Sequence, residues 1–287
     1  MIFMRKTDFS RLLTLISLLF LMIFAGCSKK AEKSPQIKIP GRIITLSPSA
    51  TEILYAVGAE NQIVAVSDFS DFPERAREKP AVGGFDGKTL SLEKILSLEP
   101  DFVYMTRGMH DFLVEPLESC GIACYLSFGD SIQAVLQEIE EISFLTGHQE
   151  EGREVIAKIR REIAGIAEFG REITVFYEVW NSPFMSPGSR SFIHDVISAA
   201  GGTNIFGDVD EPYPIVSEEA IIARAPDVIL LTRSNGITPE QVRMRPGWQE
   251  IPAVKNSRIF IIDDTKFSRP ATRIGECVQE LNSILAG

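Results

Sequence analysis

The sequence predicts an α/β protein with two α/β lobes, each built on a mostly parallel sheet, and a ligand cleft between the lobes. Three observations support this fold class. Strand-like segments alternate with helical ones, the alternation recurs in the second half of the chain, and one long amphipathic stretch separates the halves. Because such alternation is typical of parallel sheets covered by helices, each half predicts one lobe and the middle stretch predicts a connecting helix.

The first half alternates strand and helix patterns from residue 42 onward. Aliphatic and β-branched runs predict four strands, at 42–46, 63–66, 102–105 and 122–126. The first helix, over 50–57, has marked boundaries, because Ser49 and Glu52 are spaced as a capping box and Gly58 is a typical helix stop.

The amphipathic stretch 148–169 lies between the halves. It contains no proline and places Val155, Ile156, Ile159 and Ile163 on roughly one face. The spacing predicts one helix of about 20 residues and about 30 Å. Such a helix would join two lobes rigidly and keep their relative motion small. The alternative is an ordinary surface helix within one domain.

The second half repeats the alternation. Strands are predicted at 173–179, 227–231 and 258–262, and helices at 191–200 and 270–285. In addition, Ser91–Thr106 recurs 126 residues later as Ser217–Thr232, with the same serine, glutamate, Pro-Asp pair and final threonine. Each copy predicts a capped short helix, a turn and a buried strand. The predicted divisions are a lobe over 41–147, a linker helix over 148–170 and a lobe over 171–287.

The N-terminus has the pattern of an export signal. Basic residues precede an apolar run from Leu12 to Phe24, which is short for a membrane span of about 20 residues. An uncleaved membrane anchor is the alternative. Phe24–Cys27 resembles a bacterial lipobox, whose cysteine is acylated in the mature lipoprotein. Several acyl chains hold such a protein durably on a membrane. We therefore expect a lipoprotein signal peptide over 1–26, lipidation at Cys27 and a polar tether over 27–40.

Composition narrows the function classes. The net charge is −10, which disfavours nucleic acid as a partner because its phosphates would be repelled. The sequence has only three histidines, and it lacks phosphate-binding loop, GxSxG and HExxH motifs, so we expect neither a metal site nor a cofactor. Ser47 and Ser49 have no evident histidine partner, which argues against a cell-envelope enzyme on the same α/β frame, because such an enzyme needs a nucleophile with a base nearby.

Three cysteines remain beyond the signal. Cys120 and Cys124 flank a predicted turn, and Cys277 lies in the last helix. The spacing of the first two matches neither a CxxC redox motif nor a zinc site. We expect buried free thiols, with a local bridge between Cys120 and Cys124 as the alternative.

Aromatic residues collect in loops that follow predicted strands, where α/β clefts bind ligands. The candidate cleft residues are Phe69, Phe85, Phe184 and Tyr213. As a set they indicate a cleft for a large, flat, partly apolar ligand. Arg107 and Arg269 are the basic candidates beside it, unless they are ordinary surface charges. His110 follows a strand end and is either a ligand contact or a solvated loop residue.

Two acids, Glu93 and Glu219, occupy the second position of the two repeated helices. They could simply complement the helix dipole. Alternatively, each lobe presents one acid to a partner protein, which the equivalent placement favours.

These residues together resemble the substrate-binding lipoproteins of cobalamin and ferric-siderophore ABC importers, and among them the vitamin B12-binding proteins. The similarity runs from about Arg42 to the C-terminus. It rests on six stretches in order, 42–52, 66–73, 92–95, 201–206, 213–219 and 224–230.

The resemblance implies aromatic walls from both lobes, at positions matching Phe69, Phe85, Phe184 and Tyr213, with Arg269 in the C-terminal loop. It also implies that Glu93 and Glu219 dock on arginines of the membrane permease. There are departures from the family. Phe85, Tyr213 and Thr106 stand where the best-known members carry tryptophan, and the family's disulfide in the second lobe has no matching pair here.

The function expected from the resemblance is capture of a cobalamin-like corrinoid outside the cytoplasm and delivery to an ABC importer permease with its ATPase subunits. The chain would be a monomer and not an enzyme, held by its lipid anchor on the outer face of the cytoplasmic membrane or in the periplasm. The alternative keeps this architecture and changes the ligand to a ferric siderophore or haem, for which arginines, or His110 and Tyr213 as iron ligands, would matter more.

Overall fold

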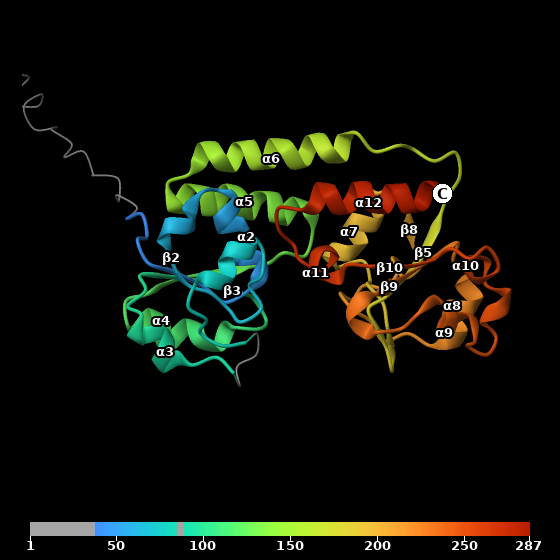
Figure 1. Cartoon of the computed structure of the whole chain (residues 1–287), viewed down its shortest axis with the longest axis horizontal. Coiled ribbons are helices and arrows are strands. Elements are labelled where there is room, and N and C mark those ends of the chain that lie inside the picture. Colours follow the sequence, from blue (N-terminus) through green and yellow to red (C-terminus); the bar gives the residue numbers. More distant parts are fainter. Residues whose placement is uncertain (1–37, 85–88) are drawn as a thin grey trace, which may run out of the picture. The chain divides into compact units, whose positions relative to one another are not determined.

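A computed structural model describes residues 38–84 and 89–287, in which Ile39–Gly287 form one structural unit with two α/β lobes (Figure 1). The predicted signal peptide, Cys27 and Phe85 lie outside the described residues. Among the residues described, no helix is long and apolar enough to cross a membrane.

The N-terminal lobe is built on a four-stranded parallel sheet in the order β2-β1-β3-β4. The strands are β1 (Ile43–Thr45), β2 (Ile63–Ala65), β3 (Phe102–Thr106) and β4 (Ala123–Ser127). The helices are α2 (Pro48–Ala56), α3 (Leu92–Ser97), α4 (Val114–Ser119) and α5 (Ile132–Thr146), with 3-10 turns at Ala59–Gln62, Glu74–Glu78 and Asp111–Leu113. All four predicted strands are therefore confirmed.

The C-terminal lobe repeats this plan with the parallel order β10-β9-β5-β8. Its sheet contains β5 (Thr174–Glu178), β8 (Thr203–Asn204), β9 (Val228–Thr232) and β10 (Ile259–Ile262), and β6 (Trp180–Asn181) pairs with β7 (Phe184–Met185) as a separate hairpin. Its helices are α7 (Phe192–Ala199), α8 (Glu218–Arg224), α9 (Pro239–Arg243), α10 (Pro252–Lys255), α11 (Asp264–Phe267) and α12 (Ile274–Ala286), with 3-10 turns at Arg233–Asn235 and Trp248–Glu250. The fold class predicted from the sequence is confirmed.

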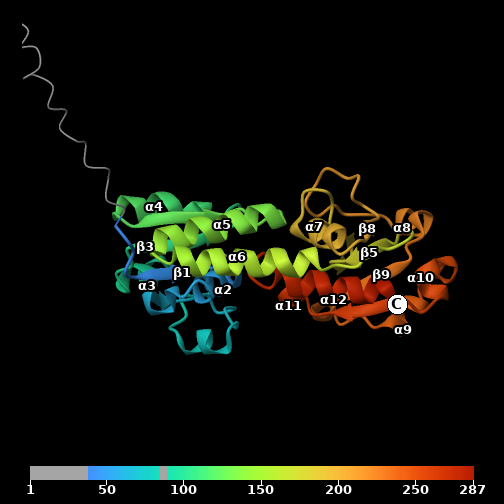
Figure 2. The same cartoon turned by 90° about the horizontal axis from the view of Figure 1, so that it is seen from above.

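The connecting helix α6 (Gln149–Ala164) lies along α5 of the first lobe and α12 of the second (Figures 1 and 2). It is shorter than the predicted 148–169, because Gly165 caps it and the chain then leaves the helical path. The expected contact with both lobes is nevertheless present.

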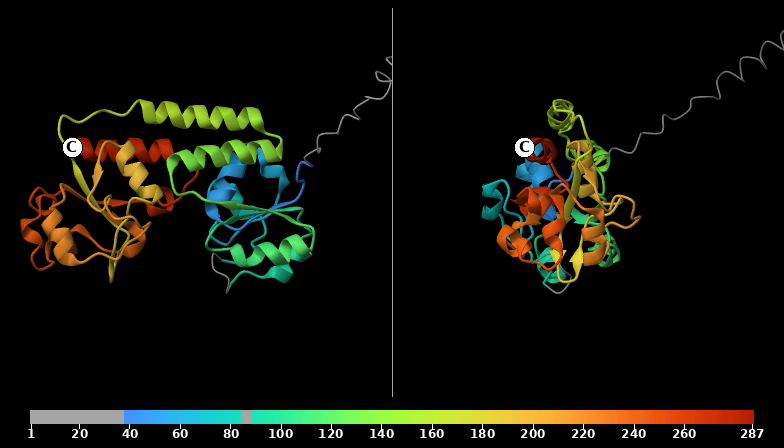
Figure 3. Two further views of the ribbon diagram at one scale, coloured as in Figure 1. Left: turned by 180° about the vertical axis from the view of Figure 1, so that it is seen from behind. Right: turned by 90° about the vertical axis from the view of Figure 1, so that its right-hand side faces the viewer.

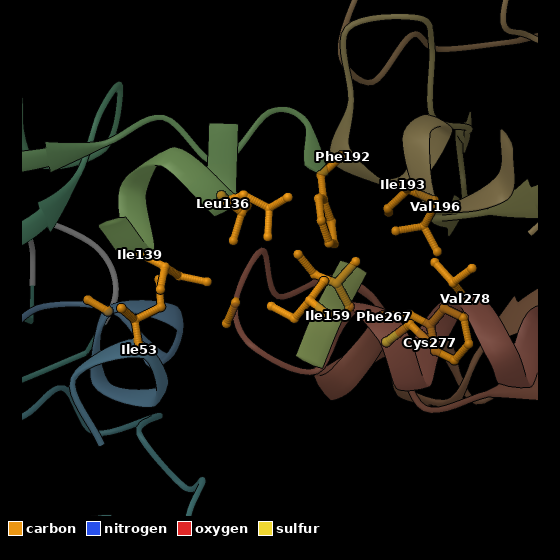
Figure 4. Packing of buried hydrophobic residues seen from close by; sticks show 14 of the residues in the cluster. Ile53, Leu136, Ile139, Ile159, Phe192, Ile193, Val196, Phe267, Cys277 and Val278 are labelled. Atoms are coloured by element: carbon orange, nitrogen blue, oxygen red, sulfur yellow. The ribbon is translucent and has the colours of Figure 1, made fainter. Parts of the chain in front are cut away.

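One hydrophobic core runs through both lobes. Ile53 of α2 and Ile139 of α5 belong to the same buried cluster as Ile159 of α6, and the cluster continues to Val196 of α7 and Val278 of α12 (Figure 4). Two further clusters lie on the opposite faces of the two sheets. A wide separation of the lobes would expose part of the shared cluster to water. The cluster therefore opposes large hinge opening.

The internal repeat is visible in the backbone as well as in the sequence. Ser91 and Ser217 cap α3 and α8 through their hydroxyls. After these helices, Glu99 and Ala225 adopt left-handed conformations, with φ of 48° and 44°. Each lies six residues after the repeated glutamate, Glu93 or Glu219. The offset of 126 therefore holds for caps, turns and strands alike.

Two local predictions are wrong. Helix α2 begins at Pro48 and is capped by Ser47, not Ser49, because Pro48 fits the first helical position and the Ser47 hydroxyl reaches the Ala50 N–H. Glu52 is consequently not part of a capping box and is buried. Cys120, Cys124 and Cys277 are free as expected. Cys120 is nevertheless exposed and Cys124 only half-buried, because Cys120 follows the end of α4 and Cys124 lies in the edge strand β4.

Candidate functional site

A cavity of about 900 Å³ lies between the lobes and is lined by both. On the N-terminal side the lining residues follow the carboxyl ends of β1 to β4, where parallel sheets bind ligands. They are Pro48, Ser49, Phe69, Thr106, Arg107, Ser127, Phe128, Gly129 and Asp130. The C-terminal side supplies Arg190, Ser191, Phe192, Pro212, Tyr213, Ser268, Arg269 and Pro270.

Aromatic rings wall this cavity from both sides. Phe69 and Phe128 are 57% and 60% exposed in the N-terminal lobe, and Tyr213 is 41% exposed opposite them. Phe192 also lines the cavity, but it is buried and belongs to the shared core. Large aromatic side chains left open around a cavity indicate an apolar ligand that covers them.

Three arginines line the cavity, and each is held differently. Arg107 stacks on Phe128, with its guanidinium carbon 3.8 Å from the ring centroid. Arg190 pairs with Asp210 at 3.2 Å on the exposed surface. Arg269 donates to Asp71 at 2.5 Å across the two lobes. The cavity therefore combines apolar walls with cationic groups.

Asp71 belongs to a tie between the lobes. Burial alone would raise the pKa of Asp71, but its hydrogen bond and charge interaction with Arg269 outweigh this, and the pKa is lowered. The carboxylate thus stays charged at neutral pH, and Arg269 is partly neutralised as a ligand contact.

The tie segment, residues 268–273, carries a second link. The Thr272 N–H and hydroxyl donate to Glu52 Oε1 at 3.1 and 3.0 Å, and Arg273 Nε donates to Glu52 Oε2 at 3.1 Å. Glu52 is buried in α2 of the N-terminal lobe, while the tie segment leads into α12. Charge-assisted hydrogen bonds therefore join the two lobes just beyond the tie-segment residues that line the cavity.

The structure does not bring Phe184 into this cavity. Its ring packs on Trp248 with centroids 5.7 Å apart, and Arg245 lies 5.0 Å over it. Arg245 in turn forms a bidentate pair with the fully buried Glu178 at 2.5 and 2.8 Å. The Phe184 side chain points inward because β7 alternates its faces, which a strand-end rule based on sequence position does not capture.

His110 is fully buried, so the expectation of a solvated loop residue is wrong. The Thr106 N–H donates to its Nδ1 at 3.0 Å, which fixes the end of β3. Thr106 lines the cavity and His110 does not. The described residues contain no cluster of three or more His, Cys, Asp or Glu suited to a metal ion.

Glu93 and Glu219 are exposed in the first turns of α3 and α8, outside the cavity lining. The pKa of Glu219 is lowered by hydrogen bonds from its own backbone N–H and from the Ser217 hydroxyl. Each lobe thus presents one charged acid at an equivalent helix start.

The sequence analysis missed Phe128, Arg190 and Phe192 as lining residues. Phe128 follows β4 directly and could have been found by the strand-end rule that selected Phe69. Arg190 and Phe192 flank the serine that caps α7, and their pattern is that of an ordinary helix start.

Comparisons with known proteins agree with this geometry. A family model described as periplasmic binding protein matches residues 43–265. The vitamin B12-binding protein of Vibrio campbellii is 30% identical over 249 residues, which cover 84% of this chain and 87% of that protein.

Two solved structures are similar along most of the chain. The crystal structure of the periplasmic vitamin B12 binding protein of Vibrio cholerae has a TM-score of 0.71 and 30% identity, over 86% of this chain and 97% of that one. A possible iron-binding, periplasmic solute-binding protein of Staphylococcus epidermidis has a TM-score of 0.77 and 28% identity, over 87% and 100%. These relatives are substrate-binding proteins, not enzymes. The resemblance seen in the sequence is confirmed, and the chain belongs to the periplasmic binding protein family.

Proposed function

We propose that this protein captures a cobalamin-like corrinoid outside the cytoplasm and delivers it to the permease of an ABC importer. The observation that carries the proposal is the cavity of about 900 Å³, walled by aromatic rings from both lobes. A corrin is a broad macrocycle with apolar faces, and a cleft that contacts both faces suits it. The names of the Vibrio relatives support the same ligand class.

A ferric siderophore or haem is the second candidate. Arg107 and Arg190 line the cavity, and the staphylococcal relative is described as possibly iron-binding. His110 does not support haem, because its Nδ1 accepts the Thr106 N–H and the ring is buried. Tyr213 lines the cavity, and its phenol is the remaining candidate for an iron ligand.

Titration with cyanocobalamin, haemin and ferric catecholate separates these ligands, since their absorbance spectra differ. Tight binding of cyanocobalamin alone supports the first proposal. Saturable binding of haemin or the ferric complex, without cobalamin binding, would replace it with the second.

The wall residues have a testable signature. Covering about 60–100 Å² of ring at ~25 cal/mol per Å² contributes about 1.5–2.5 kcal/mol, or about 10–70-fold in affinity. Phe69→Ala, Phe85→Ala and Tyr213→Ala should each weaken cobalamin binding by that factor in calorimetry, with little change in melting temperature.

Two contrasts sharpen this test. Phe144 is 51% exposed on α5 outside the cavity, so Phe144→Ala should leave affinity unchanged. Phe184→Ala should instead destabilise the fold, by up to about 3–5 kcal/mol, because Phe184 packs on Trp248. Equal affinity losses at Phe144 and Tyr213 would mean that the cavity is not the binding site.

For delivery, we propose that Glu93 and Glu219 dock on basic groups of the permease. Glu93→Arg combined with Glu219→Arg should abolish uptake while cobalamin affinity stays within about three-fold, because neither acid lines the cavity. Glu151→Arg with Glu276→Arg, in the first turns of α6 and α12, is the matched control and should retain uptake. Loss of cobalamin binding in the Glu93→Arg and Glu219→Arg variant would contradict the docking role of these acids.

Lipid anchoring at Cys27 completes the proposal and rests on the lipobox-like sequence alone. Cys27→Ser should move the exported chain from the membrane fraction to the soluble fraction. Membrane retention of the variant, with an intact mass lacking acyl chains for the wild type, would contradict anchoring at this residue.

A further inference from the structure

We propose that an apolar patch on the C-terminal lobe, formed by Trp180, Met185 and Ile215, is a docking surface for the importer permease. This inference rests on the proposed function and extends the docking site beyond Glu219. The patch residues come from the hairpin β6–β7 and from the segment that leads into α8. None of the three lines the ligand cavity.

The strand register places these side chains on one face. Trp180 lies opposite Met185 in the hairpin, and Met185 lies opposite Ile215 through an antiparallel bridge. Residues directly opposite one another in a sheet share a face. The alternate positions, Phe184 and Val216, pack instead against the core of the lobe, which confirms that the patch is the outer face.

The patch is exposed and ordered. Trp180 is 49% exposed and Ile215 67% exposed, with Met185 half-buried between them. The Trp180 indole N–H donates to the Ser182 carbonyl at 3.0 Å, so the ring is held within the hairpin. The neighbouring segment is tied to the hairpin by the Val216 N–H, which donates to the Phe184 carbonyl at 2.9 Å. Rigid exposed aromatics lose little side-chain entropy on binding and are frequent interface anchors.

Position identifies the permease as the occupant. Ile215 lies two residues after Tyr213, which lines the cavity, and four residues before Glu219. A receiver that takes ligand from the cleft must cover the residues that border the cleft. In Figure 3 the short yellow hairpin lies on the side of this lobe opposite α6, so the patch is not on the connecting helices.

The surrounding charge fits the same occupant. Glu211 precedes the patch along this segment and Glu219 follows it, and both carboxylates are exposed. A partner surface with an apolar centre and basic flanks would therefore match the patch. The permease site proposed to receive Glu219 would supply part of that basic flank.

The test uses the full exported chain and its ABC importer in nanodiscs, with docking measured by interferometry on ligand-free protein. Trp180→Ser combined with Ile215→Ser should weaken docking by about 30-fold or more, as expected for loss of an interface hot spot. Affinity for cyanocobalamin and the melting temperature should stay near wild-type values. Phe144→Ser is the matched control, because Phe144 has a similar exposure but lies on α5.

Each other outcome overturns the inference in a different way. If the double variant docks as well as the Phe144 control, the patch is not a docking surface, and the proposed function stands. If the wild-type protein binds cobalamin but does not dock, both the delivery role and the patch are contradicted. A matching loss of cobalamin affinity would assign the patch to the ligand site. Loss of a dimer in sedimentation, or loss of binding to protein-free vesicles, would assign it to a second copy or to lipid.

Discussion

The two lobes share a repeated plan but differ in how each one satisfies a buried acid. In the C-terminal lobe, Glu178 is paired within the lobe by Arg245. In the N-terminal lobe, Glu52 is paired by Thr272 and Arg273 of the tie segment, which leads into the other lobe. Glu178 is therefore satisfied within its own lobe, whereas Glu52 is satisfied by contact with the other lobe.

Replacing Arg245 or Arg273 should give the largest losses of unfolding free energy, and the two losses should differ between the lobes. Arg245→Ala leaves the fully buried Glu178 unpaired and should cost about 3–5 kcal/mol of unfolding free energy. Arg273→Ala should cost less, about 1–3 kcal/mol, because Thr272 still donates two hydrogen bonds to Glu52. Urea unfolding measures both values, and a larger loss at Arg273 would reverse the comparison.

The repeated aspartates should behave alike. Asp101 accepts the Gly41 and Arg42 N–H groups before β1, and Asp227 accepts the Thr174 N–H at the start of β5. Asp101→Ala and Asp227→Ala should each cost about 1.5–3 kcal/mol, the range for hydrogen bonds to a charged group. Glu172→Ala, an exposed neighbour, is the control for urea unfolding. A loss at one aspartate alone would mean that the repeat is not energetically equivalent.

Acid pH should reduce the stability that one partly buried aspartate contributes in each lobe. At Asp71 and Asp227 burial raises the pKa, but hydrogen bonds and nearby arginines lower it further, so the net pKa is below the usual value. A lowered folded-state pKa gives stability that is present above the unfolded pKa of about 3.9 and is lost as pH falls through the folded pKa. The melting temperature should therefore drop below about pH 4, less steeply in Asp71→Asn and Asp227→Asn. An unchanged slope in both variants would exclude these carboxyls as the cause.

Thiol reactivity should show the smallest effect. Cys120 is exposed, whereas burial, with Glu118, raises the pKa of Cys124 to about 11 and burial raises that of Cys277 to about 12. Because the thiolate is the reactive form, Cys120 should react quickly with Ellman's reagent before unfolding, and Cys124 and Cys277 slowly. Fast reaction of Cys277 would indicate that the α12 contact with the core opens readily.

Most of the fold could be predicted from the sequence. Strand composition is a local signal, and the repeat at an offset of 126 residues can be recognised by aligning the chain with itself. All seven predicted strands are present, and the repeated caps at Ser91 and Ser217 are confirmed. The errors concern choices between neighbouring possibilities. Ser47 and Ser49 are both good caps, and only the proline at 48 decides between them.

The candidate site was predictable in outline only. Phe69, Arg107, Tyr213 and Arg269 line the cavity because loops after parallel strands converge on one edge. Phe184 lies outside the cavity lining and packs on Trp248, because strand alternation turns its side chain inward. That register depends on strand pairing, for which the single sequence carries no signal. The roles of Glu52 and Asp71 depend on contacts with residues about 200 positions away, for which a single sequence carries no signal.

The core shared through α5, α6 and α12 has a consequence for the kinetics of ligand capture. If the lobes barely move, no slow closure follows the encounter, and the observed association rate should rise linearly with ligand concentration without reaching a plateau. The dissociation rate would then be set by how fast the ligand breaks its contacts with the aromatic residues of the cavity. The partner that receives the ligand would have to accelerate that departure by forcing apart two lobes that share one core.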